Sequence, residues 1–346
     1  MLSFENDYAE GAHPRILQRL LDTNLEQLPG YGADAYTQSA IEKIRMACHD
    51  PYAEIFFLTG GTQANMTVLD ALLIGVEAVV AADSGHIAVH EAGAIEFTGH
   101  KVITLPQREG KLEADALESY LHAFFSDPTC EHMPQPGAVY ISHPTEYGTL
   151  YTKKELKALR EVSDRYGLSL FLDGARLGYG LMSPGTDVTL PDLSEWTHAF
   201  TIGGTKVGAL CGEAVVFPGS GVPRSFFTHV KQHGALLAKG RLCGVQFDTL
   251  FTDDLYFEIS RHAISMAQRL KEGFEKRGFR FFLDSPTNQQ FLILENGLME
   301  RLAHRVRFSL WGPFDANHSV VRFAASWATT REQVDQLMEI LDEEGR

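Results

Sequence analysis

Two stretches decide the fold of this chain: LSLFLDGAR at residues 168–176 and HAFTIGGTK at residues 198–206. Each begins with a short, largely apolar run, which is typical of a strand buried in a parallel sheet. Each then continues into glycine and polar residues, Asp173 and Arg176 in the first stretch and Lys206 in the second. Because ligands of open α/β sheets bind beyond the carboxyl ends of the strands, we expect these side chains to share one site.

An acid, a guanidinium and an amine at one sheet edge suit a particular cofactor, pyridoxal 5'-phosphate. A carboxylate such as Asp173 keeps a pyridine nitrogen protonated, which makes the ring an electron sink, and a lysine such as Lys206 forms a Schiff base with the aldehyde. The sequence TIGGTKVGA at residues 201–209 surrounds Lys206 with small residues, which leaves room for a bulky ligand. The competing interpretations are a helix-capping aspartate and an exposed lysine.

Apolar runs and helical patterns alternate through most of the chain. The runs at 56–58, 78–82, 102–105, 138–142 and 214–217 are separated by helical patterns, such as the one at 153–165, and an N-terminal helix is expected within 14–28. This alternation predicts an α/β fold, a mostly parallel sheet with helices on both faces.

A second pattern follows the proline- and glycine-rich stretch at 217–223. A helical pattern at 253–276 leads to apolar runs at 280–283, 290–294, 306–310 and 320–324, and a last helix is expected from Arg331. We therefore predict an N-terminal segment and large domain at residues 1–245, and a small C-terminal α+β domain at residues 246–346.

Composition restricts the class of protein. The 346 residues suffice for one large and one small domain, and 44% hydrophobic with 22% charged residues is typical of a globular protein. The net charge of −15 argues against a nucleic-acid partner. The four cysteines lack CxxC spacing, the start lacks the regions of a signal peptide, and no apolar stretch is long enough to span a bilayer. We expect a cytoplasmic protein without membrane contact.

The sequence Thr59-Gly60-Gly61-Thr62 lies between an apolar run and a helical pattern. Backbone N–H groups at such a helix start bind phosphate, although a glycine turn with a threonine cap has the same sequence. The G-x-G-x-x-G fingerprint is absent, which disfavours a nicotinamide-dependent dehydrogenase.

The order and spacing of these motifs resemble those of the threonine aldolase and β-eliminating lyase family of fold-type I pyridoxal 5'-phosphate enzymes. The segments that carry the resemblance are TGGTQAN at 59–65, His86 with HEAG at 90–93, PTE at 144–146, DGAR at 173–176, and Lys206. The resemblance implies the fold-type I architecture. It also implies retro-aldol cleavage of an L-β-hydroxy-α-amino acid, L-threonine or L-allo-threonine, to glycine and an aldehyde.

The resemblance also assigns roles to single residues. The implied cofactor-binding residues are Gly61, Thr62, His86, Asp173, Arg176, Thr205 and Lys206, with Lys231 and Lys239 reaching a neighbouring subunit. The implied substrate-binding residues are Asn6, Tyr31, Arg176 and Arg322. Because fold-type I sites lie at a dimer interface, a homodimer or homotetramer is implied. No metal is expected at the site, and a structural cation elsewhere is left open.

One motif departs from the family pattern. Many threonine aldolases have Asn-Thr-His where this chain has Pro144-Thr145-Glu146. A carboxylate accepts a hydroxyl proton if its pKa and position suit, and an imidazole does so as well. The catalytic residues are therefore predicted to be Lys206 with Glu146 and His86, and the base is left open between the last two.

Two other functions are compatible with these patterns. A β-eliminating lyase would use the same cofactor and scaffold, because fold does not fix reaction. A non-catalytic α/β protein would use the GGT loop to hold some other phosphate-bearing ligand, and it would not need Lys206.

Overall fold

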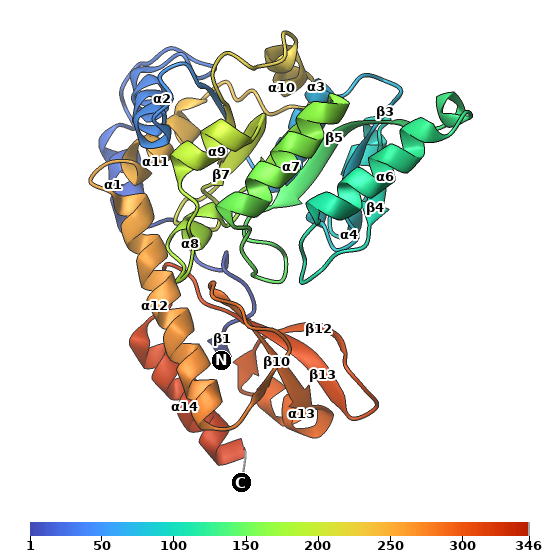
Figure 1. Cartoon of the computed structure of the whole chain (residues 1–346). Coiled ribbons are helices and arrows are strands. Elements are labelled where there is room, and N and C mark those ends of the chain that lie inside the picture. The colour runs from blue at the N-terminus through green and yellow to red at the C-terminus, as the bar shows by residue number, and fades with distance from the viewer. Residues whose placement is uncertain (345–346) are drawn as a thin grey trace.

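A seven-stranded sheet forms the centre of the larger lobe (Figure 1). The structure, a computed structural model, describes residues 1–344. The strands of this sheet are β2 (Glu54–Leu58), β3 (Glu77–Ala82), β4 (Lys101–Leu105), β5 (Gln135–Ser142), β6 (Ser169–Asp173), β7 (Ala199–Gly203) and β8 (Glu213–Phe217). They lie in the order β2-β8-β7-β6-β5-β3-β4, with β8 antiparallel to both of its neighbours and all other pairs parallel. The predicted mostly parallel sheet is confirmed.

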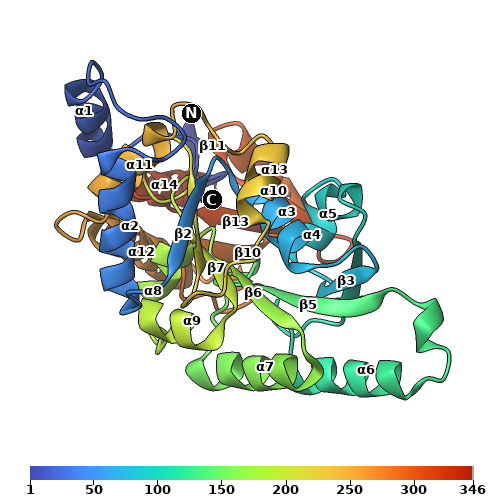
Figure 2. The same ribbon diagram turned by 90° about the horizontal axis from the view of Figure 1, so that it is seen from above.

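Helices cover both faces of this sheet. The helices of the larger lobe are α1 (Pro14–Asp22), α2 (Ala35–Cys48), α3 (Gly61–Leu72), α4 (His86–Val89), α5 (Ala94–Phe97), α6 (Ala114–Ser126), α7 (Lys153–Tyr166), α8 (Leu177–Leu181), α9 (Leu190–Trp196), α10 (Phe226–Gln232) and α11 (Arg241–Leu250), with a 3-10 turn at Cys130–His132. Viewed from above, α3 and α10 lie on one side of the strands, and α6, α7 and α9 lie on the other (Figure 2).

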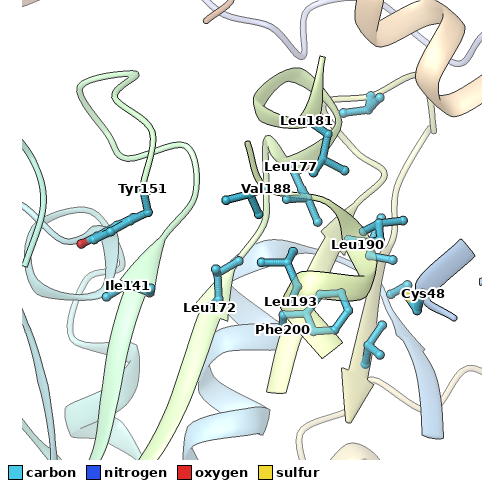
Figure 3. Close-up of a cluster of buried hydrophobic side chains, with 14 of the residues drawn as sticks. Cys48, Ile141, Tyr151, Leu172, Leu177, Leu181, Val188, Leu190, Leu193 and Phe200 are labelled. Atoms are coloured by element: carbon cyan, nitrogen blue, oxygen red, sulfur yellow. The ribbon is translucent and has the colours of Figure 1, made fainter. Parts of the chain in front are cut away.

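The alternation of side chains along each strand gives the sheet two hydrophobic clusters. In β3, Val80 belongs to the cluster on the α7 and α9 side, whereas Val79 belongs to the cluster on the α3 and α10 side. Figure 3 shows part of the first cluster, with Leu172 of β6, Phe200 of β7 and Leu193 of α9. Because both faces are buried, the strands have nearly continuous apolar runs, which is why the sequence reveals them.

The smaller lobe contains an antiparallel sheet of order β12-β13-β10-β9. Its elements are β9 (Arg280–Phe281), β10 (Gln289–Glu295), β11 (Val306–Arg307), β12 (Ser309–Pro313), β13 (His318–Ala324), α12 (Leu255–Lys276), α13 (Asn296–Ala303) and α14 (Arg331–Glu344). The long helix α12 extends from the larger lobe along the smaller one (Figure 1).

The N-terminal strand β1 (Leu2–Ser3) lies in the smaller lobe. Leu2 pairs with Val306 of β11 in a parallel arrangement, and the Phe4 carbonyl accepts a hydrogen bond from Ala324 N. Residues 2–4 therefore pair with strands of the smaller lobe.

Two expected elements differ in the structure. The apolar run at 306–310 forms two strands, because β11 pairs with β1 whereas β12 pairs with β13. The N-terminal helix ends at Asp22 rather than near residue 28, because the following bonds reach back only three residues, from Asn24 N to Leu21 O and from Glu26 N to Thr23 O. The predicted domain boundary at residues 245 and 246 falls inside α11 and stays a prediction. Across residues 1–344, no helix combines the length and apolar character needed to span a membrane.

Phe323 is fully buried in the smaller lobe, where its ring contacts those of Phe4, Phe274 and Phe308. We expect Phe323→Ala to lower the free energy of unfolding by about 3 to 5 kcal/mol, because neighbouring rings cannot fill the cavity. Urea denaturation followed by circular dichroism measures this loss. Leu310→Ala, at a residue that is 63% exposed, is the control, and equal effects of the two substitutions would contradict the described core.

Candidate active site

Four side chains singled out by the sequence meet at one edge of the larger sheet. Asp173 ends β6, Lys206 follows β7, Glu146 follows β5, and His86 begins α4 after β3. All four line one pocket, whose other lining residues are Gly61, Asn65, Glu91, Ser142, Pro144, Thr145, Ala175 and Arg176. Because β3, β5, β6 and β7 are parallel, their carboxyl ends open on the same side. The structure thus brings these side chains together, and their roles stay predictions.

The carboxylate of Asp173 is held by three hydrogen bonds. Asn65 Nδ2 and the Tyr140 hydroxyl donate to Oδ2 at 2.8 and 2.7 Å, and Ala175 N donates to Oδ1 at 2.8 Å. These three donors fix the position of the carboxylate at the end of β6. Asn65 and Tyr140 were not predicted as site residues, although Asn65 belongs to the TGGTQAN motif.

Lys206 lies in a tight loop between β7 and β8. The backbone N–H groups of Gly204 and Thr205 donate to Gly212 O at 3.0 and 3.1 Å, which closes the loop. Burial, and then the positive charge of Arg176, lower the pKa of the Lys206 amine against the opposing effect of nearby carboxylates. A larger fraction of the amine is therefore neutral and nucleophilic than in an exposed lysine.

Glu213, the first residue of β8, is a buried carboxylate that the sequence analysis missed. Burial raises its pKa to about 8, although a hydrogen bond with Thr205 and the charge of Lys206 act in the opposite direction. Its Oε2 has no hydrogen-bond partner among residues 1–344. Nothing in the EAVVF run distinguishes Glu213 from an ordinary strand end, so only the fold reveals it.

The ring of His86 is oriented by a second buried acid. His86 Nδ1 lies 2.7 Å from Glu91 Oε1, and the same oxygen accepts a hydrogen bond from Asn65 Nδ2 at 2.7 Å. An ionised carboxylate only accepts hydrogen bonds, so Nδ1 is the donor in this contact, and Nε2 is an acceptor in the neutral form of the ring. Asn65 therefore links Glu91 and His86 to Asp173.

Glu146 joins this network through the backbone of His86 and the side chain of Ser142. Its Oε1 accepts hydrogen bonds from His86 N at 2.9 Å and from the Ser142 hydroxyl at 2.6 Å. Burial raises the pKa of Glu146, and the negative charge of Asp173 adds to the effect, although the Ser142 hydrogen bond lowers it. A carboxylate with a raised pKa is suited to proton transfer near neutral pH.

Arg176 forms a buried bidentate ion pair with Asp7. Arg176 Nε and Nη2 donate to Asp7 Oδ2 and Oδ1 at 2.6 and 2.9 Å, and Asn288 Nδ2 also donates to Oδ2 at 2.9 Å. Burial raises the pKa of Asp7, but the charge and hydrogen bond of Arg176, with Lys206 and Asn288, outweigh it and lower the pKa to about 2. Asp7 was not predicted from the sequence. Its carboxylate occupies Nε and Nη2 of Arg176, so these two groups are not free for a substrate.

Arg322 lies on β13, and one of its guanidinium nitrogens makes no hydrogen bond to residues 1–344. Its Nη1 donates to Gln289 Oε1 at 2.9 Å and its Nη2 to Ser309 Oγ at 3.0 Å, while Nε has no partner within the described part of the chain. Burial, and then the charge of Arg176, lower its pKa to about 10, so the guanidinium stays charged at neutral pH. Asn6 lies in the N-terminal segment beside Asp7, where its Oδ1 accepts from Tyr8 N at 3.0 Å.

The remaining predicted residues differ in position. Gly61 lines the pocket, Thr62 is exposed in the first turn of α3, and the Thr205 hydroxyl accepts a hydrogen bond from Gly212 N at 3.1 Å. The other three side chains are exposed and outside the pocket lining: Tyr31, Lys231 and Lys239. Lys231 Nζ lies 5.1 Å from the centre of the Tyr31 ring. Their predicted contribution to a neighbouring subunit's site stays a prediction.

The groups of the pocket fit pyridoxal 5'-phosphate. They include an amine for the aldehyde, an anchored carboxylate for the pyridine nitrogen, and free backbone N–H groups at the start of α3 for the phosphate. Two buried polar atoms of the pocket, Asn65 Oδ1 and Glu91 Oε2, lack a hydrogen-bond partner within residues 1–344. These two oxygens can therefore accept hydrogen bonds from a group bound in the pocket.

This fold and this pocket define a fold-type I pyridoxal 5'-phosphate-dependent enzyme. Aspartate aminotransferase from Thermus thermophilus shares the fold with a TM-score of 0.72 at 15% identity, covering 99% of this chain and 91% of that one. The family model for β-eliminating lyases matches residues 15–306, and the chain belongs to that family.

Relatives with greater sequence similarity include two threonine aldolases. The low specificity L-threonine aldolase of Pseudomonas aeruginosa is 28% identical over 338 residues, which cover 96% of this chain and 95% of that protein. The solved structure of Leishmania major threonine aldolase matches with a TM-score of 0.95 at 41% identity and 99% coverage of both chains.

Asp7→Asn removes the counter-ion of buried Arg176, and we expect it to lower the free energy of unfolding by about 3 to 5 kcal/mol. Because the folded-state pKa of Asp7 is lowered from 3.8 to about 2, its contribution is fully present above pH 3.8 and is lost as the pH falls toward 2. Thermal unfolding between pH 5 and 8 should therefore show a constant difference from the wild type. Asp253→Asn, which breaks the exposed pair with Arg15, is the control. An equal loss in both variants would refute the assignment.

Proposed function

We propose that this enzyme cleaves the Cα–Cβ bond of an L-β-hydroxy-α-amino acid, L-threonine or L-allo-threonine, to give glycine and an aldehyde. The observation that carries the proposal is one pocket that combines the amine of Lys206, the anchored carboxylate of Asp173 and a second carboxylate of raised pKa, Glu146. The two threonine aldolases among its relatives support the same reaction.

Pyridoxal 5'-phosphate, when bound, supplies an aldehyde for the substrate amine and a ring that accepts the electrons of the broken bond. Lys206 would hold the aldehyde, and its lowered pKa favours the nucleophilic amine. Asp173 would hold the proton of the pyridine nitrogen, since Asn65 and Tyr140 keep its carboxylate in place. The proposed phosphate ligands are Gly61, Thr62 and Thr205, with Lys231 and Lys239 from a second copy of the chain.

We assign the base for the β-hydroxyl proton to Glu146. Its carboxylate lines the pocket and is fixed by Ser142, and its raised pKa makes proton uptake easier near neutral pH. His86 lines the same pocket with Nε2 as an acceptor, because Glu91 engages Nδ1. We propose that His86 positions the cofactor ring and that Glu146 holds the proton.

The substrate carboxylate is proposed to bind Arg322. This guanidinium is charged, is rigidly placed by Gln289 and Ser309, and keeps its Nε without a protein partner among the described residues. A carboxylate satisfies such a donor. Asn6 and Arg176 complete the proposed carboxylate site, and Asp7 fixes the orientation of Arg176.

We further propose a cytoplasmic homo-oligomer, a dimer or tetramer, in which two copies complete each site. The exposed side chains of Tyr31, Lys231 and Lys239 lie outside the pocket of their own chain and are available to a neighbour. The four cysteines are all free, as is usual in a reducing compartment.

The products and the visible spectrum test the proposed function. The enzyme loaded with pyridoxal 5'-phosphate should convert L-threonine to equal amounts of glycine and acetaldehyde, measured by chromatography and a coupled assay. Lys206→Ala should lose both this activity and the visible absorption band of the lysine-bound cofactor. Ammonia and a keto acid as products would instead select the β-eliminating lyase, and a protein that never takes up the cofactor would refute both.

The pH dependence of the rate tests the assignment of the base. Because Glu146 must be ionised to accept a proton and its pKa is raised, kcat should fall as the pH drops through that raised pKa. Glu146→Gln should lower kcat by about 10² to 10⁴ and remove this acidic limb. His86→Phe, which keeps an aromatic ring, should retain the limb. The opposite pattern would make His86 the base.

A further inference from the structure

A cluster of three histidines surrounds one carboxylate on the α3 and α10 side of the larger sheet, outside the pocket. Asp70 Oδ2 lies 2.8 Å from His229 Nδ1 and 3.1 Å from His233 Nε2, and Asp70 Oδ1 lies 3.5 Å from His100 Nε2. Asp70 belongs to α3, His229 to α10, and His233 caps the end of α10. The cluster therefore joins two helices and the residue just before β4.

Three of these donor atoms have the spacing of a metal site. Asp70 Oδ2, His229 Nδ1 and His233 Nε2 all lie within 4.8 Å of one another. With zinc–ligand bonds of about 2.0 to 2.2 Å, donor atoms around a tetrahedral ion lie roughly 3.3 Å apart. The observed oxygen-to-nitrogen distances of 2.8 and 3.1 Å differ from this value by only a few tenths of an ångström.

The contact of His233 Nδ1 with Thr67, on the side of the ring away from Asp70, shows which ring nitrogen carries the proton. Thr67 Oγ1 lies 2.7 Å from Gln63 O, and because a carbonyl only accepts, the hydroxyl proton points to Gln63. His233 Nδ1, 3.0 Å from the same hydroxyl, must then be the donor. In its neutral form, His233 consequently directs the lone pair of Nε2 at the carboxylate of Asp70.

His100 has the same arrangement. Its Nδ1 lies 2.9 Å from Glu77 O, which only accepts, so Nδ1 carries the proton and Nε2 of the neutral ring directs a lone pair at Asp70. A hydrogen bond from the outer nitrogen to a carbonyl or hydroxyl is the usual arrangement of metal-binding histidines. The lone pair that neutral His233 aims at Asp70 Oδ2 is satisfied by a cation placed between them.

We propose that Asp70, His229 and His233 bind one divalent transition-metal ion of the zinc type, with solvent at the fourth position. The carboxylate and imidazole donors match the ligands that zinc prefers. The three side chains are between 11% and 21% exposed, so the site is mostly enclosed and still reachable by an ion. His100 lies beside the site as the residue that faces the second oxygen of Asp70.

The ion stabilises the start of α3. Gln63 Nε2 donates to His233 O at 3.1 Å, and Gln63 Oε1 accepts from Thr59 N and Thr59 Oγ1 at 3.2 and 2.5 Å. A fixed His233 therefore fixes Gln63 and, through it, the turn at residues 59–61 that opens toward the pocket. This role is structural and does not require the ion to touch a substrate.

Zinc retention by the full-length enzyme tests the proposal. The protein, prepared without a polyhistidine tag and loaded with pyridoxal 5'-phosphate, is stripped with a chelator, given excess zinc at pH 7.5, and dialysed. Metal analysis should find one zinc per chain, and zinc should raise the midpoint of thermal unfolding. Because the ligands must be deprotonated, zinc should be released as the pH falls below about 6.

Matched variants separate this site from other zinc-binding groups. Asp70→Asn and His233→Gln should retain at least tenfold less zinc and lose the zinc-dependent rise in the unfolding midpoint, whereas His122→Gln, at an exposed residue of α6, should behave as the wild type. If Asp70→Asn or His233→Gln fails to fold, His229→Gln is measured in its place, with the same expected loss of zinc. Equal retention in all variants, or a wild type that binds no zinc, overturns the proposal. None of these readouts depends on catalytic activity, so failure here leaves the proposed reaction intact.

Discussion

The ion pair between Arg176 and Asp7 joins parts of the molecule that are far apart in sequence. Arg176 follows β6 at the carboxyl ends of the strands of the larger sheet. Asp7 lies 169 residues earlier and follows β1, the strand that pairs with β11. Asn288 of the smaller lobe donates to the same carboxylate. One buried anion thus connects the N-terminal segment, the sheet edge and the smaller lobe. Burying this pair is costly unless both partners are satisfied, which restricts the relative position of these three parts.

The pocket concentrates ionisable groups in a partly dehydrated space, where their mutual effects are strong. Burial, and then the charge of Arg176, lower the pKa of the Lys206 amine, while burial raises the pKa values of Glu146 and Glu213. Asp173 has a different environment, with three donors on its oxygens. Asp173 is therefore fixed in place by its donors, whereas Glu146 has a raised pKa that suits proton transfer.

Sequence alone predicted the sheet because strands buried on both faces have continuous apolar runs, and it predicted Asp173 and Lys206 because they follow such runs. It did not predict Asp7, Tyr140 or Glu213, whose roles depend on contacts across lobes or strands that no local pattern encodes. The division of residues 306–310 into two strands has the same cause, since it depends on the N-terminal partner of β11. Asn65 and Glu91 lay within quoted motifs, but their link to Asp173 required the three-dimensional structure.

The parallel pairing of Leu2 with Val306 has a consequence for the order of folding. During synthesis, Leu2 must remain without this partner until Val306 has been made. Contacts of such large sequence separation form slowly, since the intervening chain must first be ordered. All strands of the larger sheet precede β11 in the chain, so this sheet can assemble before β1 is paired. The segment that carries Asp7 to Arg176 is therefore fixed later than the sheet edge that it completes.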